Sequence, residues 1–183
     1  METLFATPPV LGFAAASGTG KTTLLCKLLP LLAAGGLRVG VIKHSHHDFD
    51  IDRPGKDSYR LRQAGARQML IASPWRTAWI EEQEQRREPQ LDELLQRLQR
   101  ERLDLILVEG FRHVAFPKIE LHRRALERPL LYPQDASIIA IASDEEVDAP
   151  LPRLDLNRPE EVAHFILDLV ATMPNSQPQR SPE

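Results

Sequence analysis

The chain has little of several features that mark specialised classes of protein. Its 183 residues include one cysteine, Cys26, so no internal disulfide can form, and a reducing compartment is favoured. No apolar run approaches the roughly 20 residues that span a bilayer. Residues 1–9 lack the basic region and the long apolar stretch of a signal peptide. We therefore expect a cytoplasmic protein that is not associated with a membrane.

An excess of charge of one sign is also missing. The formal net charge is −3, and glutamate and aspartate are mixed among the numerous arginines. Such a balance gives no indication of a nucleic acid partner. The composition, 42% hydrophobic and 27% charged, is that of an ordinary globular chain long enough to bury a core. We expect one domain over residues 1–171 and a disordered tail, rich in Pro, Ser and Gln, over residues 172–183.

Short and long apolar segments alternate along the chain. The short ones are typical of buried strands, and the long ones repeat apolar residues at helical spacing. We predict strands over 10–15, 38–43, 105–108, 119–122 and 138–142, helices over 22–34, 56–64, 89–100 and 159–170, and a hairpin over 68–73 and 76–81. This order predicts an α/β fold in which helices cover both faces of a mostly parallel sheet. The hairpin and the late strands suggest that the sheet is mixed.

The segment AASGTGKT, residues 15–22, follows an apolar strand and opens a helix, as a Walker A phosphate loop does. Its glycines let successive backbone N–H groups point at phosphate oxygens, and the helix N-terminus adds a positive dipole end. Lys21 would neutralise the terminal phosphates, and the Thr22 hydroxyl would bind Mg²⁺. The first position is Ala15, not glycine, which costs little if its φ is not positive. We predict a nucleoside triphosphate site formed by Ser17, Gly18, Thr19, Gly20, Lys21, Thr22 and Thr23.

A carboxylate ends the apolar strand LILVE. Glu109 would then lie at the carboxyl edge of the sheet beside the phosphate loop, as a Walker B acid does. We expect it to bind Mg²⁺ together with Thr22 and to share the catalytic role with Lys21. The usual residue at this point is aspartate, and a strand-ending surface carboxylate is the alternative. Asp104 begins the same strand and is excluded, because it lies at the opposite edge.

A polar loop, His44 to Asp52, follows the second predicted strand. Three interpretations compete: a transition-metal site, a switch loop that senses phosphate and Mg²⁺, and a solvated loop. An EF-hand is excluded, because Arg53 and Tyr59 stand where glycine and glutamate are needed. Adjacent histidines rarely bind one ion together and no cysteine is near, so the switch interpretation is favoured. Its candidate residues are His44, His46, His47, Asp48, Asp50 and Asp52.

Other side chains have two interpretations each. Asp144 follows an apolar strand and would accept the N1–H and N2–H groups of guanine, or simply belong to a turn. Arg112, His113 and Lys118 follow Glu109 and would meet a phosphate, or be surface charge. We expect the Arg123–Arg124 pair to be solvated and Cys26 to lie in the core, on the apolar side of the first helix.

Three segments together identify a family: FAAASGTGKTTLL, VGVIKHSHHDFDIDRPGKDSYRLRQAGA and LDLILVEGF. They resemble the bacterial molybdopterin-guanine dinucleotide biosynthesis proteins of the MobB family, and the resemblance extends to about Val170. The middle segment discriminates, since generic P-loop proteins lack it. The family's phosphate-loop residues fall on Gly18 to Thr22, its histidine and aspartate loop on His44 to Asp52, and its strand-end glutamate on Glu109.

The resemblance implies a P-loop NTPase fold that binds GTP and Mg²⁺, weak GTPase activity and a homodimer. It also implies an adapter role beside the guanylyltransferase MobA, which joins GMP to molybdopterin, and it leaves molybdopterin as a candidate ligand. Two other functions compete. A nickel metallochaperone GTPase would usually carry cysteines or a longer histidine tract. A small-molecule kinase needs an acceptor site and usually an arginine-rich lid, for which Arg112 and the Arg86 region leave room.

Overall fold

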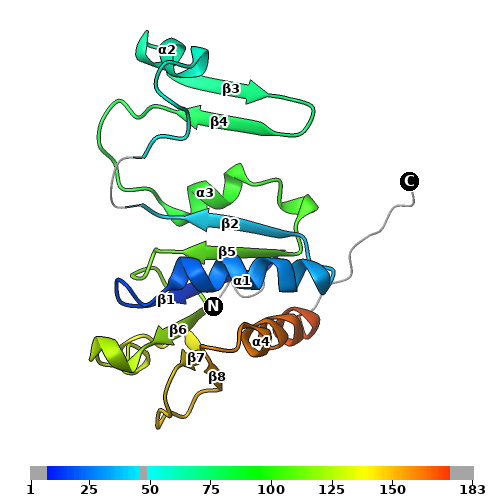
Figure 1. Ribbon diagram of the computed structural model, residues 1–183, viewed down its shortest axis with the longest axis vertical. Helices are drawn as coiled ribbons and strands as arrows, with labels where there is room; N and C mark the ends of the chain where they lie inside the picture. Colours follow the sequence, from blue (N-terminus) through cyan, green and yellow to red (C-terminus); the bar gives the residue numbers. More distant parts are fainter. Residues whose placement is uncertain (1–7, 46–48, 174–183) are drawn as a thin grey trace. The chain divides into compact units, whose positions relative to one another are not determined.

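The computed structural model describes residues 8–45 and 49–173 (Figure 1). The chain divides into two compact units, where the sequence suggested a single domain. The first comprises Met1–His44 and Gln90–Glu183, and the second comprises Ser45–Pro89. In the part of the chain that the structure describes, no helix is long and apolar enough to cross a membrane.

The first unit is built on a six-stranded sheet in the order β2-β5-β1-β6-β7-β8. Its strands are β1 (Val10–Ala14), β2 (Val39–Lys43), β5 (Leu105–Glu109), β6 (Lys118–His122), β7 (Ile138–Ser143) and β8 (Arg153–Asp155). Every pairing in this sheet is parallel. All carboxyl ends therefore meet at one edge, which is where open α/β sheets bind their ligands.

Helices cover both faces of the sheet, as predicted. Helices α1 (Lys21–Ala34) and α4 (Pro159–Ala171) pack over one face, and α3 (Leu91–Arg97) over the other. Strand β5 shows why both faces are apolar: Leu105 and Leu107 join the core under α1 and α4, while Ile106 and Val108 join the core under α3. Short 3₁₀ helices follow at Arg100–Arg102, Arg124–Leu126 and Tyr132–Gln134.

The phase of helix α1 corrects one expectation. The buried positions of this helix are Leu24, Leu25, Leu28 and Leu32, which form a single stripe along it. Cys26 lies outside that stripe and is exposed. The placement of Cys26 in the core was therefore wrong.

The second unit holds helix α2 (Asp57–Gln63) and the predicted hairpin, β3 (Gln68–Ala72) and β4 (Thr77–Glu81). The hairpin forms an antiparallel sheet of its own, so antiparallel pairing occurs here and not within the six-stranded sheet. The Arg62 guanidinium ties the unit together. It pairs with Asp50 at 2.8 Å, with Asp52 at 2.8 Å and with Glu82.

Candidate functional site

The loop predicted to bind phosphate connects β1 to α1 at the carboxyl edge of the sheet. Gly18 and Gly20 adopt φ of 81° and 95°, which only glycine accepts readily. Thr19 is buried, and its hydroxyl donates to the Ala16 carbonyl at 2.8 Å, which closes the loop on itself. Ala15 is not at a positive φ, so the departure from glycine at that position carries no strain. The structure thus gives the sequence AASGTGKT the conformation expected of it.

Lys21 lies over the loop that precedes it. Its Nζ donates to the carbonyls of Ala15 at 3.3 Å and Ala16 at 3.1 Å. Burial lowers the pKa of this ammonium, and the positive charges of Arg112 and Lys43 lower it further, while Glu109 acts in the opposite sense. A triphosphate at the loop would supply the counter-charge that this group lacks.

Strand β5 brings Glu109 against the first turn of α1. The Thr22 hydroxyl donates to Glu109 Oε1 at 2.8 Å, and Lys43 Nζ lies 3.2 Å from Glu109 Oε2 and 3.2 Å from Thr22 Oγ1. Lys43 ends β2 opposite Glu109 in the parallel register. A hydroxyl and a carboxylate at this spacing are suitable ligands for Mg²⁺ beside a bound triphosphate. The structure therefore brings together the two residues predicted to bind the metal, and adds Lys43.

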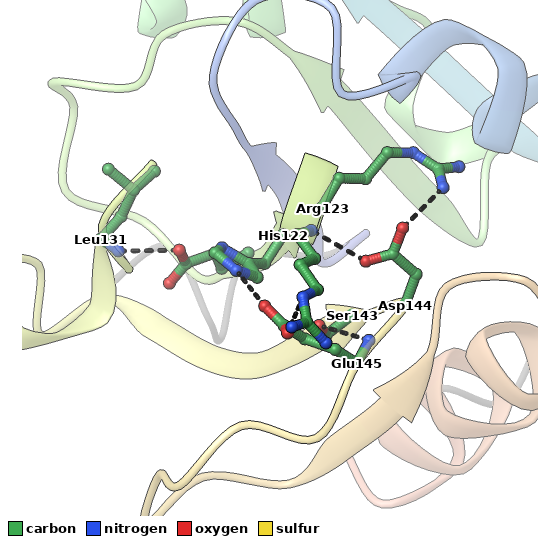
Figure 2. A network of polar contacts seen from close by, with 8 residues as sticks. His122, Arg123, Leu131, Ser143, Asp144 and Glu145 are labelled. Atoms are coloured by element: carbon green, nitrogen blue, oxygen red, sulfur yellow. Dashed lines mark hydrogen bonds and ion pairs between the residues drawn. The ribbon is translucent and has the colours of Figure 1, made fainter. Parts of the chain in front are cut away.

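On the other side of the loop, Arg123 connects the loop to Asp144. Figure 2 shows its pairing with Asp144. Its Nε donates to the Thr19 carbonyl at 2.9 Å, and its Nη1 donates to Asp144 Oδ2 at 3.1 Å. The Arg124 backbone N–H donates to Asp144 Oδ1 at 3.0 Å and, with Arg123, lowers the pKa of that carboxyl group. The expectation that Arg123 is solvated was wrong. Asp144 lies at the predicted edge, and its contact with guanine stays a prediction.

Two further carboxylates order the strand ends around Arg123. The buried Glu120 accepts hydrogen bonds from the backbone N–H groups of Leu131 at 2.7 Å and Tyr132 at 2.9 Å. Burial raises the pKa of Glu120, and these two donors oppose the rise. Glu145 Oε1 lies 3.2 Å from His122 Nε2. Figure 2 marks this contact with a dashed line. The segment that follows β6 is thus held firmly to the sheet.

The residues predicted for the switch loop are divided between the two units. In the first unit, the His44 backbone N–H donates to the Glu109 carbonyl at 2.8 Å, and the imidazole stacks on Phe111 with ring centroids 4.7 Å apart. Phe111 is held at φ 53°, an unusual conformation for a non-glycine residue beside a site. Gly110 is needed here, because a Cβ would lie 2.6 Å from the Cβ of His44.

In the second unit, Asp50 and Asp52 are paired with Arg62. His46, His47 and Asp48 lie outside the described residues. Over residues 8–45 and 49–173, no three His, Cys, Asp or Glu side chains form a group that could bind a metal ion. The switch interpretation of this loop stays a prediction.

The remaining predicted residues have distinct places. Ser17 and Thr23 are exposed on the loop and on the first turn of α1. Lys118 is buried, with Nζ 2.9 Å from Asp135 Oδ2 and bonded to the carbonyls of Arg112 and Val114, so its role is structural. Sequence reasoning assigned no role here to Lys43 or Arg123. Both follow or end a strand at the carboxyl edge, and that position was the signal available for finding them.

Comparison with known proteins gives a consistent assignment. The family model for MobB, molybdopterin guanine dinucleotide synthesis protein B, matches residues 10–144. A molybdopterin-guanine dinucleotide biosynthesis adapter protein of Escherichia coli K12 is 50% identical over 161 residues, which cover 87% of this chain and 92% of that protein. The protein of the same name from Haemophilus influenzae is 43% identical, with 86% of this chain and 87% of the relative covered.

Solved structures agree with this. A crystal structure of molybdopterin-guanine biosynthesis protein B superposes with a TM-score of 0.68 at 29% identity, covering 87% of this chain and 99% of that one. The structure of Bacillus subtilis MobB has a TM-score of 0.67 at 22% identity, which supports the fold. The family model spans the phosphate loop, Glu109 and Asp144 alike. The chain belongs to the family of molybdopterin guanine dinucleotide synthesis protein B.

Proposed function

We propose that this protein is a GTP-binding adapter that assists the attachment of GMP to molybdopterin. The observation that carries the proposal is the contact of Thr22 with Glu109, 2.8 Å apart at the mouth of a phosphate loop. It provides a place for Mg²⁺ between the loop and the strand-end acid, with Lys21 above the terminal phosphates. The adapter role rests on the family and on the names of the relatives from E. coli and H. influenzae.

Guanine is the base that the edge of the sheet suits best. Asp144 follows β7, which is separated from β1 and the loop by β6 alone, and Arg123 links Asp144 to the loop. Each of its oxygens accepts one hydrogen bond in the structure, which leaves acceptor capacity on both. A carboxylate accepts the paired N1–H and N2–H donors of guanine, and adenine presents no such pair.

Slow hydrolysis is part of the proposal. Arg123, the arginine that contacts the loop, is engaged by the Thr19 carbonyl and by Asp144, and Lys43 is engaged by Glu109. An arginine that stabilises the transition state is worth about 10³–10⁵ in rate. We therefore expect the isolated protein to hydrolyse GTP well below the ~1–10³ s⁻¹ of dedicated enzymes. The guanylyltransferase MobA would carry out the nucleotidyl transfer.

A homodimer is the proposed state of assembly. An isolated two-stranded hairpin is marginally stable in water. Leu70 and Trp79 are directly opposite each other on β3 and β4, yet they are 67% and 41% exposed. A second copy of the chain, pairing through the same surface, would bury this cross-strand pair on both subunits.

Reconstitution tests the proposal. Purified MobA, molybdopterin, Mg²⁺ and GTP are incubated with and without this protein, and the guanine dinucleotide formed is measured. The proposal expects more product with the protein present than without it, and no product from the protein alone. Absence of stimulation over a wide range of concentration, together with fast GTP turnover by this protein alone, would contradict the adapter role.

A further inference from the structure

A pocket of about 360 Å³ opens at the carboxyl end of β6. In the strand order β5 and β6 flank β1, so the pocket lies on the side of the phosphate loop away from Glu109. Ser17 and Thr19 of the loop line the pocket together with Arg112, Arg123 and Arg128. It therefore borders the place of the phosphates without including Lys21, Thr22 or Glu109 among its lining residues.

Partly buried hydrogen bonds hold the walls of this pocket in place. Glu120 lines the pocket, and each of its carboxylate oxygens accepts a hydrogen bond from a backbone N–H group of the segment that follows β6. Arg123 is held between the Thr19 carbonyl and Asp144. Glu127 adopts φ of 48° just before Arg128, so an unusual turn in the chain precedes this lining residue. A site with such walls is formed before any ligand arrives.

Two of the three arginines, Arg112 and Arg128, differ from the other arginines near the sheet edge in their pairing within the described part of the chain. Arg38, Arg123 and Arg124 are each paired with a carboxylate. By contrast, among the residues that the structure describes, no carboxylate pairs with the side chain of Arg112 or Arg128. Guanidinium groups bind phosphate oxygens in pairs of parallel hydrogen bonds, and they are suited to this more than a lysine is.

We propose that this pocket binds a small phosphate-bearing molecule, a phosphomonoester, through Arg112 and Arg128. Leu126, Pro129 and Leu131 line the same pocket and provide an apolar surface for the rest of the molecule. The volume is at the lower end of small-molecule sites, which hold about 300–1,000 Å³. The inference deepens the proposed function, on which it rests for the nucleotide at the neighbouring loop.

The position of Arg112 shows how the two sites would cooperate. Arg112 lines the pocket together with Ser17 and Thr19 of the loop, so it lies beside the loop that would hold the triphosphate. A phosphomonoester in the pocket would then be held next to the triphosphate, with separate positive charges for each. This is the arrangement that a protein needs in order to present two phosphate-bearing molecules together.

The test uses 4-methylumbelliferyl phosphate, a flat fluorescent phosphomonoester, whose anisotropy reports binding. The full-length protein is first saturated with Mg²⁺ and a non-hydrolysable GTP analogue, which occupies the loop. The wild type is compared with the double variant Arg112→Gln/Arg128→Gln. Arg124→Gln is the matched control, since Arg124 is 82% exposed and does not line the pocket. Unphosphorylated 4-methylumbelliferone tests whether the phosphate is required.

We expect the wild type and Arg124→Gln to bind the phosphate probe equally, and the double variant to bind at least about tenfold more weakly. The unphosphorylated probe should not bind. Equal binding by the double variant, no binding by the wild type, or displacement of the probe by the GTP analogue would each overturn the second site. A separate titration with a fluorescent GTP analogue tests the proposed function. If that analogue does not bind, the probe titration without nucleotide still decides the pocket.

Discussion

Replacing Glu109 by glutamine should uncouple nucleotide binding from Mg²⁺. The carboxylate accepts the Thr22 hydroxyl at 2.8 Å and lies 3.2 Å from Lys43 Nζ. Glutamine has the same length and retains an oxygen for Thr22, so the geometry should persist while one negative charge is lost. With a metal bound between the loop and the acid, that charge is the favourable partner of the ion. Without the metal, it repels the triphosphate.

The size of the effect follows from the contact. Hydrogen bonds to charged groups contribute about 1.5–3 kcal/mol, and the Coulomb energy of two unit charges 4 Å apart near a protein surface is about 4 kcal/mol. Because Lys43 already neutralises part of the carboxylate's charge, we use the range of about 1.5–3 kcal/mol and not the full Coulomb energy. We expect the gain in affinity that Mg²⁺ confers to fall about 10- to 100-fold.

The assay is a titration with a fluorescent GTP analogue, once with Mg²⁺ and once with EDTA. The ratio of the two dissociation constants is the measured quantity, so general loss of folded protein does not imitate the effect. Asp104→Asn is the matched control. It removes the same charge at the other end of the same strand, where the carboxylate pairs with Arg38 at 2.9 Å. If Glu109→Gln and Asp104→Asn give the wild-type ratio alike, Glu109 does not act on the metal.

Three further predictions concern single features of the structure. Lys21→Ala should abolish triphosphate binding and leave the melting temperature nearly unchanged, because the ammonium donates to the loop carbonyls of Ala15 and Ala16 and does not belong to the apolar core; tight binding by the folded variant would refute the phosphate loop. Arg62→Met should speed amide hydrogen exchange over residues 57–82 at neutral pH. Arg60→Met should not, because Arg60 forms only an exposed pair with Asp57 at 3.8 Å. Arg62 lowers the pKa of Asp52, so the ion pair stabilises the folded protein above the ordinary carboxyl pKa of about 3.9, and this effect is lost as the pH falls through the lowered pKa. The difference in exchange rate between variant and wild type should then vanish. A difference that persists would contradict the ion-pair account. Leu70→Ser/Trp79→Ser should convert a dimer to a monomer in light scattering, while Trp75→Ser, 95% exposed at the hairpin turn, should not; an unchanged mass would place the interface elsewhere.

The fold was largely predictable because its strands are short apolar runs with clear boundaries in the sequence. Strand β8 was missed: it spans three residues at the edge of the sheet, and Leu154 is its one buried residue. So short a segment has no period to detect. The position of Cys26 was missed for a related reason. The many leucines of α1 are spread round more than one side, and the sequence does not show which side faces the sheet.

The site was predictable where chemistry lies within one segment and less so where it depends on strand order. The loop from Ala15 to Thr22 is local, and so is the glutamate that ends β5. The roles of Lys43 and Arg123 depend on β2 lying next to β5 and on β6 lying next to β1, with Arg123 following β6. The sequence shows neither adjacency. The pocket beyond the loop combines Ala16, Ser17 and Thr19 with Arg112 and with some of the residues between positions 120 and 131, so its existence required the folded chain.

The distribution of charge along the sheet edge explains why binding and turnover would be separate in such a protein. On the β2 and β5 side, Lys43 and Glu109 lie side by side against Thr22 in the first turn of α1, which suits a metal and a triphosphate. On the β6 and β7 side, arginines predominate, and the one that touches the loop is fixed in place by Asp144. A fixed arginine orders the loop, yet it is not released to stabilise a transition state on the terminal phosphate. On the proposed function, the protein therefore holds phosphates side by side and leaves their chemistry to its partner, which is what distinguishes an adapter from an enzyme.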